Sequence, residues 1–95
     1  MPAYLIAEIE VTDPTLYERY KPLAAAAIAA GGGRYLVRGG ETVALEGAAP
    51  AGRLVILEFP NAAAARAFYD GPDYAEARRI RERAAKSRVI IADGV

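Results

Sequence analysis

The stretch GGRYLVRGG at residues 32–40 decides the architecture of this chain, because two glycine pairs bracket five residues that favour a β-strand. The first pair lies where an alanine-rich helical pattern ends, and glycine adopts the left-handed backbone that ends helices at little cost. The second pair permits a bulge or tight bend before the chain becomes extended again at 42–46. Alternation within the strand predicts that Arg34, Leu36 and Arg38 point to one face of a sheet.

The residues before this stretch predict a strand followed by a long helix. Residues 3–11 alternate between an apolar face and a mixed face, which is typical of a strand. Asp13 is a suitable N-cap, and Pro14 fits the first helical position because the N–H that it lacks would be unpaired there. The helical spacing continues to about Ala30. Pro22 interrupts it and is expected to kink or split the helix.

The residues after this stretch predict two further strands and two short helices. Pro60 ends an apolar strand, Asn61 caps the first helix, and Asp73 caps the second helix after Gly71 and Pro72 have broken the first. With a loop at 47–52, these elements are expected at 53–59 (strand), 62–70 (helix), 74–85 (helix) and 89–92 (strand). The complete order is therefore strand, helix, strand, strand, helix pair, strand.

With right-handed crossovers, this order predicts an α+β fold of the ferredoxin-like βαββαβ type, formed by a single domain of residues 1–95. Its four-stranded sheet is antiparallel, with the strands at 3–11 and 53–59 in the centre. Both helical segments lie on one face of the sheet, because two layers complete such a fold.

The other face of the sheet is expected to be apolar and uncovered. Alternation places there Tyr4, Ile6, Leu36, Leu54, Ile56 and Ile90. So much contiguous apolar surface is unusual for a stable monomer, and a second copy packed sheet against sheet would bury it. The sequence therefore predicts a symmetric homodimer.

Composition excludes several classes of function. Twelve basic and twelve acidic residues cancel to zero net charge, which argues against nucleic acid or an anionic membrane as a partner. The chain lacks cysteine and histidine, and so lacks disulfides, thiolate nucleophiles, the commonest metal ligand and the commonest general base. No metal and no cofactor are therefore expected. Acidic residues interrupt the apolar run at the N-terminus, which predicts neither a signal peptide nor a membrane span, and a cytoplasmic location.

Charged side chains on the uncovered face form the candidate site. Alternation places there Glu8, Glu10, Arg34, Arg38, Glu58 and Arg88. Buried charges must pair or bind an ion, so Arg38 either forms a structural ion pair with Glu58 or Glu8, or holds an anion in a cavity between two sheets. In the second case Glu58 or Glu8 is the candidate base and Tyr4 the candidate proton donor or hydrogen-bonding partner. Arg81 is expected to direct its guanidinium toward the mouth of the pocket.

Three further patterns are assigned to structure rather than function. The glycines at 31–33 follow a helix and precede a strand, the reverse of the order in a phosphate-binding loop. The basic run at 78–88 is typical of a solvated helix face, and without interleaved aromatic residues it does not indicate a nucleic-acid site. Aromatic residues at helical spacing are expected in the core with their hydroxyls at its edge: Tyr17, Tyr20, Phe68, Tyr69 and Tyr74.

Six segments carry a family resemblance: VTDPTLYERY (11–20), GGRYLVRGG (32–40), LEG (45–47), RLVILEFPN (53–61), AFYDGPDY (67–74), and the closing basic helix with ADG (92–94). Together they resemble the uncharacterised bacterial family known as domain of unknown function 1330 over nearly the whole chain. The family usually has Ser-Pro-Glu-Tyr where this chain has Gly-Pro-Asp-Tyr at 71–74. The resemblance implies a subunit of the dimeric αβ-barrel superfamily, whose members include cofactor-free monooxygenases, muconolactone isomerases and haem-degrading enzymes. It implies no reaction, since the family has no established activity.

Two functional hypotheses follow. In the first, a homodimeric barrel binds a small anionic or carbonyl-bearing metabolite between its sheets, and any reaction is a proton transfer or a cofactor-independent oxidation, as in an isomerase or a monooxygenase. The catalytic residues would then be Glu58, Glu8 and Tyr4, and the substrate-binding residues Arg38 and Arg81. In the second, the protein is a non-catalytic structural or interaction dimer, and the same charges form buried ion pairs.

Overall fold

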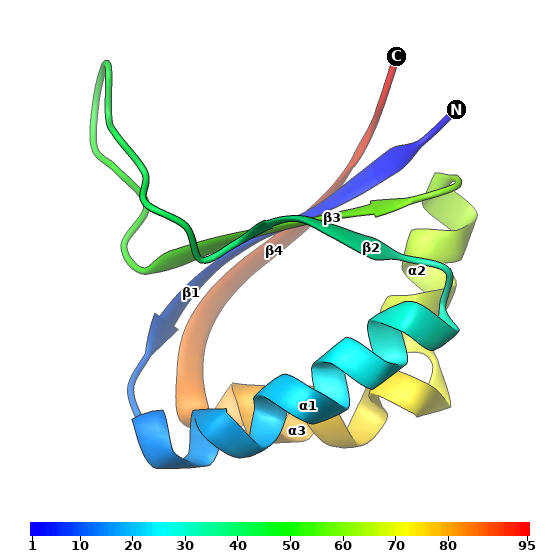
Figure 1. Cartoon of the computed structure of the whole chain (residues 1–95), viewed down its shortest axis with the longest axis horizontal. Helices are drawn as coiled ribbons and strands as arrows, with labels where there is room; N and C mark the ends of the chain where they lie inside the picture. The colour runs from blue at the N-terminus through cyan, green and yellow to red at the C-terminus, as the bar shows by residue number, and fades with distance from the viewer.

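In the computed structural model, which describes residues 1–95, strands and helices follow one another in the predicted order (Figure 1). They are β1 (Ala3–Val11), α1 (Pro14–Ala30), β2 (Arg34–Arg38), β3 (Arg53–Phe59), α2 (Ala62–Asp70), α3 (Pro72–Ala84) and β4 (Ala85–Asp93). The strands form one antiparallel sheet in the order β2-β3-β1-β4, so β1 and β3 are central. The prediction of a ferredoxin-like βαββαβ fold is confirmed.

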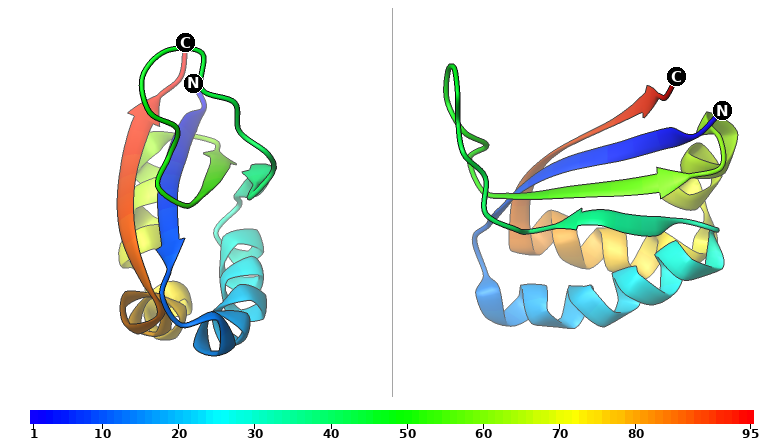
Figure 2. Two further views of the ribbon diagram at one scale, coloured as in Figure 1. Left: turned by 90° about the vertical axis from the view of Figure 1, so that its left-hand side faces the viewer. Right: turned by 45° about the horizontal axis from the view of Figure 1, so that its top comes forward.

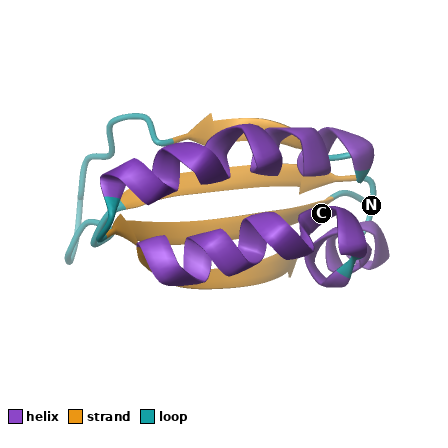
Figure 3. Cartoon of the chain, turned by 90° about the horizontal axis from the view of Figure 1, so that it is seen from below, coloured by secondary structure: helices purple, strands orange, loops and turns teal.

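All three helices lie on one side of the sheet, which leaves the other side without a helix (Figure 2). Seen from the helix side, α1 and α3 run next to each other and along the strands (Figure 3). The core fills the space between the two layers, and Phe59 is its largest fully buried side chain. The aromatic residues predicted in the core pack there, with Tyr69 at its edge. None of the helices combines the length and the apolar character needed to cross a membrane.

Local capping fixes where the first two helices begin. The carboxylate of Asp13 accepts a hydrogen bond from the backbone N–H of Leu16 at 3.1 Å, and the side chain of Asn61 accepts one from Ala64 at 2.7 Å. Both caps were predicted and are confirmed. Pro22 does not split the helix: α1 continues through it on an exposed side, where water can satisfy the carbonyl group that proline leaves unpaired.

Three predicted boundaries are wrong. Helix α3 begins at Pro72 with Gly71 as its N-cap, so Asp73 lies in the first helical turn rather than before it. Strand β4 begins at Ala85 rather than at 89, because the basic residues that end the helical pattern pair with β1 instead. Residues 42–46 form no strand. They belong to a long loop at 39–52 that projects away from the helices (Figure 1).

Strand β2 contains a bulge that changes which residues face the helices. Its pairing with β3 shifts between Tyr35 and Val37, which leaves Leu36 as an extra residue. Beyond the bulge, Arg38 lies opposite Val55, a buried residue of the helix-covered face. The prediction that Arg38 shares the uncovered face with the acidic residues is therefore wrong, because one extra residue reverses the alternation.

The uncovered side of the sheet, called here the open face, carries an apolar strip as predicted. The register places there Tyr4, Ile6, Leu54, Ile56 and Ile90 as predicted, and adds Val37, which pairs with Ile56 next to the bulged Leu36. Two ion pairs lie on the same face, between Arg34 Nε and Glu58 Oε1 at 2.7 Å and between Arg88 Nη2 and Glu8 Oε2 at 2.9 Å. Glu58 and Glu8 therefore form ion pairs, as the structural hypothesis predicted. Their partners are Arg34 and Arg88, however, and not Arg38.

Substitution of two glycines by alanine tests how closely the chain at the start of β3 approaches β1. A Cβ atom at Gly52 would collide with the backbone of Ile9, whereas the Cβ position at Gly40 is surrounded by open space. We expect Gly52→Ala to lower the free energy of unfolding by about 1–3 kcal/mol through overpacking. The matched variant Gly40→Ala should change it by less than about 0.5 kcal/mol. Urea denaturation followed by circular dichroism checks both values, and equal stability of the two variants would contradict the packing described.

Candidate functional site

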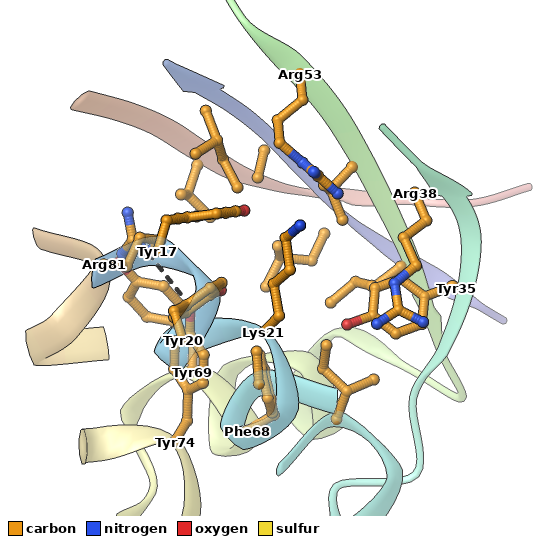
Figure 4. A pocket seen from close by; sticks show the side chains of 18 residues that line it. Tyr17, Tyr20, Lys21, Tyr35, Arg38, Arg53, Phe68, Tyr69, Tyr74 and Arg81 are labelled. Atoms are coloured by element: carbon orange, nitrogen blue, oxygen red, sulfur yellow. Dashed lines mark hydrogen bonds between the residues drawn. The ribbon is translucent and has the colours of Figure 1, made fainter. Parts of the chain in front are cut away.

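A cavity lies between the helix-covered face of the sheet and helix α1 (Figure 4). Its enclosed part is narrow: the centre of a water-sized sphere can move within about 40 Å³, and only the open solvent at the mouth raises the total empty space to about 560 Å³. Of its 18 lining residues, 14 are hydrophobic or aromatic, four are lysine or arginine, and none is acidic. The side chains that carry charge or a hydroxyl are Tyr17, Tyr20, Lys21, Tyr35, Arg38, Arg53, Tyr69, Tyr74 and Arg81. The cavity is therefore apolar with an excess of positive charge.

Arg81 of α3 forms the inner end of the cavity and is only 5% exposed. Its Nε donates a hydrogen bond to the hydroxyl of Tyr74 at 3.3 Å, and its Nη2 donates one to the hydroxyl of Tyr69, also at 3.3 Å. The hydroxyl of Tyr74 shares a further hydrogen bond of 2.7 Å with that of Tyr20. No carboxylate of the chain forms an ion pair with Arg81. The guanidinium is thus buried among phenols without a counter-ion.

Arg38 and Arg53 form the outer end of the cavity, where β2 ends and β3 begins. The guanidinium carbon of Arg38 lies 4.3 Å from the ring centroid of Tyr35, close enough for a cation–π contact that orients it. The guanidinium carbon of Arg53 lies 5.6 Å from the ring centroid of Tyr17. The Nε of Arg53 is buried and has no hydrogen-bond partner. Both arginines also lack an acidic partner.

Three tyrosines of the cavity, Tyr17, Tyr20 and Tyr35, have a raised pKa and so keep their hydroxyl protons at neutral pH. Burial raises the pKa of Tyr20 far above its usual value, and its neighbour Tyr74 raises it further. Burial also raises the pKa of Tyr17 and of Tyr35, although nearby arginines offset part of this rise. For Arg81, burial lowers the pKa, but the surrounding phenol oxygens more than compensate and the net change is a rise. The site therefore combines a permanent cation with hydroxyl donors.

This lining can bind an anion or a carbonyl oxygen, but it contains no base. Lys21 is paired with Glu18 at 2.7 Å on the exposed side of α1, so the unpaired charge comes from the three arginines. Arginine matches carboxylate geometry with parallel hydrogen bonds, and a phenol can donate one more. No carboxylate or imidazole lines the cavity to abstract a proton. No group of histidine, cysteine, aspartate or glutamate side chains is arranged to hold a metal ion.

The structure divides the residues that the sequence predicted for one site. Arg38 and Arg81, the predicted substrate-binding residues, line the same cavity, but it lies beneath the helices and not on the open face. Glu58, Glu8 and Tyr4, the predicted catalytic residues, lie on the open face. There Tyr4 lies opposite Glu58 in the β1–β3 pairing. The carboxylates of Glu58 and Glu8 each form an ion pair with an arginine. The geometry thus places the two arginines at opposite ends of one cavity and leaves the three other residues on the far side of the sheet.

Several lining residues were not singled out from the sequence as functional. Arg53 lies two residues before Val55 and four before Leu57 along β3. The alternation of side chains therefore predicts that it points to the core face, and this pattern could have identified it as a cavity residue. Tyr20 and Tyr74 were assigned to the core, which is correct, but their shared hydrogen bond joins residues 54 positions apart. No local pattern predicts such a contact.

The sheet order, the helix layer and the crossovers define this chain as a ferredoxin-like α+β protein. The chain belongs to the family described as Domain of unknown function (DUF1330), whose family model matches residues 2–95. The resemblance seen in the sequence is confirmed. A comparison with curated proteins finds no significant match.

Solved structures similar to this chain share its fold at low sequence identity. A protein of unknown function from Rhodopseudomonas palustris is 22% identical with a TM-score of 0.72, covering 99% of this chain and 82% of that one. A dimeric ferredoxin-like protein of unknown function from Jannaschia sp. CCS1 is 15% identical with a TM-score of 0.69, covering 99% and 100%. SnoaB, a cofactor-independent oxygenase from Streptomyces nogalater, is 16% identical with a TM-score of 0.68, covering 99% and 93%. At these identities the similarity shows the fold alone.

Removal of the Tyr74 hydroxyl, which is hydrogen-bonded to both Tyr20 and Arg81, tests how much the network at the inner end of the cavity contributes to stability. Tyr74→Phe removes the partner of Tyr20 and one acceptor of Arg81, and leaving buried polar groups unpaired should lower the free energy of unfolding by about 1–3 kcal/mol. Tyr35→Phe is the matched control, because Tyr35 lines the same cavity without a hydrogen bond, and should cost less than about 0.5 kcal/mol. Chemical denaturation measures both, and an unaffected Tyr74 variant would show that the network contributes nothing.

Proposed function

We propose that this protein is a homodimer in which the cavity of each subunit, between the sheet and the helices, binds a small anionic or carbonyl-bearing molecule. The observation that carries the proposal is the lining, in which three arginines without an acidic partner stand beside tyrosine hydroxyls and no carboxylate. Arg81 is buried, Arg53 is partly buried and Arg38 is exposed, so Arg81 bears most of the penalty for burying an unpaired charge, which amounts to several kcal/mol. An anionic ligand relieves that penalty and completes the hydrogen bonding.

Arg81 is the proposed primary ligand-binding residue. It is the only buried charged residue of the chain, and its two hydrogen bonds to phenols are long at 3.3 Å. A guanidinium carries five N–H donors, so donors remain for a ligand oxygen. Arg38 is the second proposed contact and acts from the outer end of the cavity. The ligand then lies under the helices, which replaces the position between two sheets that the sequence favoured.

The open face supports the dimer. Leu36 and Ile90 are 45% and 47% exposed there, beside the half-buried apolar side chains of the central strands. A second copy packed on this face would remove the strip from water, and a two-fold axis makes the same patch serve both subunits. Among the structurally similar proteins, those from Jannaschia sp. CCS1 and Thermobifida fusca YX are described as dimeric.

The ion pairs of the open face fit the structural hypothesis for the acidic residues. Arg34 with Glu58 and Arg88 with Glu8 place opposite charges side by side within one subunit, so a dimer interface there contains matched charges rather than lone ones. These pairs support the non-catalytic interpretation for this face, and the lining of the cavity supports the ligand-binding interpretation there. The two hypotheses describe different sides of the same sheet.

The same lining favours a second candidate function, the oxidation of a bound molecule by O₂ without a cofactor. Cationic groups and hydroxyl donors stabilise the anionic form of a bound enol or phenol, which is its electron-rich form. SnoaB is described as a cofactor-independent oxygenase, and at 16% identity it supports this candidate by analogy of fold only. Oxygen uptake in the presence of a bound phenolic acid distinguishes this function from binding alone.

Substitution of Arg81 tests ligand binding. With benzoate as the probe, we expect Arg81→Gln to lower the affinity at least about tenfold, the ratio that corresponds to about 1.4 kcal/mol. Arg81→Lys keeps the charge without the fork geometry and should lie between that variant and the wild type. Arg79→Gln, an exposed position on the same helix, should leave the affinity unchanged. Isothermal titration calorimetry measures all four proteins.

Stability separates this role of Arg81 from that of a structural ion pair. Because Arg81 has no acidic partner, Arg81→Gln strands no charge, and the fold is expected to persist in circular dichroism. Loss of a partner in a buried pair would instead lower stability by about 3–5 kcal/mol. Wild-type protein that does not bind benzoate, or binding that Arg81→Gln leaves intact, would overturn the proposed function.

The dimer has its own test on the open face. Ile56→Arg places a charge in the apolar strip at its centre and should convert the dimer to a monomer, because that charge has no partner across the interface. Ala63→Arg, at an exposed position of α2, adds the same charge elsewhere and should leave the dimer intact. Native mass spectrometry and light scattering give the mass of each variant. A monomeric wild-type protein would refute the proposed interface.

A further inference from the structure

The cationic residues of the cavity fall into two separate groups. Figure 4 shows Arg81 on one side of the pocket and Arg38 on the other, with Tyr17 and Lys21 between them. Arg81 comes from α3, whereas Arg38 and Arg53 come from the paired strands β2 and β3 at one edge of the sheet. The arginines thus lie at both ends of the cavity, and the ammonium group of Lys21, which is paired with Glu18, lies between them.

The outer group is held in place by its surroundings. The ring of Tyr35 lies against the guanidinium of Arg38 at 4.3 Å. Gly39 adopts a φ of 72°, and a Cβ atom there would approach the guanidinium carbon of Arg53 to 2.8 Å. The glycine therefore leaves the space that this guanidinium occupies. The buried Nε of Arg53 has an N–H without an acceptor in the chain.

The space between the two groups is apolar and bordered by an aromatic ring. Buried side chains of β1, β3 and α1 line it, among them Ile9, Val55 and Ile28. Tyr17 extends into the cavity between the two ends, and its ring lies 5.6 Å from the guanidinium carbon of Arg53. A flat apolar body fits such a lining better than a polar one.

From this arrangement we infer that the ligand is a planar dianion, an aromatic or unsaturated dicarboxylic acid with one carboxylate at Arg81 and the other at Arg38 and Arg53. This inference rests on the proposed function and names its substrate class. A ligand with one anionic group satisfies one end of the cavity and leaves the other end without a counter-ion. A dicarboxylate places one carboxylate at each end, where its oxygens accept from the guanidinium of Arg81 and from those of Arg38 and Arg53.

The experiment compares each dicarboxylate with its own monoamide, which has nearly the same size but only one charge. The probes are benzene-1,4-dicarboxylate and naphthalene-2,6-dicarboxylate, which differ in the separation of their carboxylates, and the two monoamides. Isothermal titration calorimetry on the wild-type protein is expected to show that at least one dicarboxylate binds about tenfold more tightly than its monoamide, equivalent to about 1.4 kcal/mol.

Variants of the outer end locate the second carboxylate. In the double variant Arg38→Gln with Arg53→Gln, the tenfold preference should fall to within about twofold, while the affinity for the monoamide stays near that of the wild type. The control variant is Arg34→Gln, because Arg34 belongs to the same strand as Arg38 but lies on the open face. It should retain the full preference for the dicarboxylate over its monoamide. If the double variant does not fold, Arg38→Gln alone provides the same comparison, because this side chain is exposed.

The outcomes separate this inference from the proposed function. If neither dicarboxylate exceeds its monoamide by more than about twofold, but benzoate binding still depends on Arg81, the cavity is a single-anion site and the inference of a dianion is wrong. A preference that survives in the outer-end variants would also refute it. If no carboxylate binds at all, the proposed function fails and the dianion inference fails with it.

Discussion

The buried guanidinium of Arg81 links the three helices of this small domain. It lies on α3, donates to Tyr69 of α2 and to Tyr74 of α3, and through Tyr74 is connected to Tyr20 of α1. A guanidinium that is 5% exposed loses most of its hydration, and phenol oxygens replace only part of it. The helix layer therefore surrounds a charge that its own residues leave uncompensated. The electropositive character of the cavity follows directly from that arrangement.

A single extra residue in β2 decides how charge is distributed between the two faces of the sheet. Without the bulge at Leu36, Arg38 would lie on the open face, beside Arg34 and the acidic residues. With it, Arg38 joins Arg53 at the cavity, and the acids Glu8 and Glu58 keep Arg88 and Arg34 as partners. The open face is thereby left with matched charges around an apolar strip, which suits an interface. The cavity is left with unmatched cations, which suits an anionic ligand.

The sequence predicted those features of the fold that depend on local chemistry. Asp13 and Asn61 cap helices through their own side chains, and the alternation along β1 and β3 is regular, so these elements could be placed residue by residue. The bulge could not be placed, because the stretch at 34–38 alternates without a break and the irregularity depends on its pairing with a distant strand. Strand β4 was predicted too short since its first residues, exposed and basic, resemble the end of a helix.

The candidate site was only half predictable for the same reason. Arg38 and Arg81 were singled out as arginines near a pocket, and both line the cavity, but their common environment depends on tertiary contacts between α1, α3 and the sheet. The zero net charge of the chain hides this environment, because a balance of charge over 95 residues says nothing about where each sign accumulates. Within the cavity three arginines lack an acidic partner, and no carboxylate or histidine lines it, so the protein can stabilise negative charge there but cannot create it by removing a proton. Any chemistry in this cavity must therefore begin with a molecule that is already an anion, or that becomes one because the arginines lower the pKa of its own acidic group.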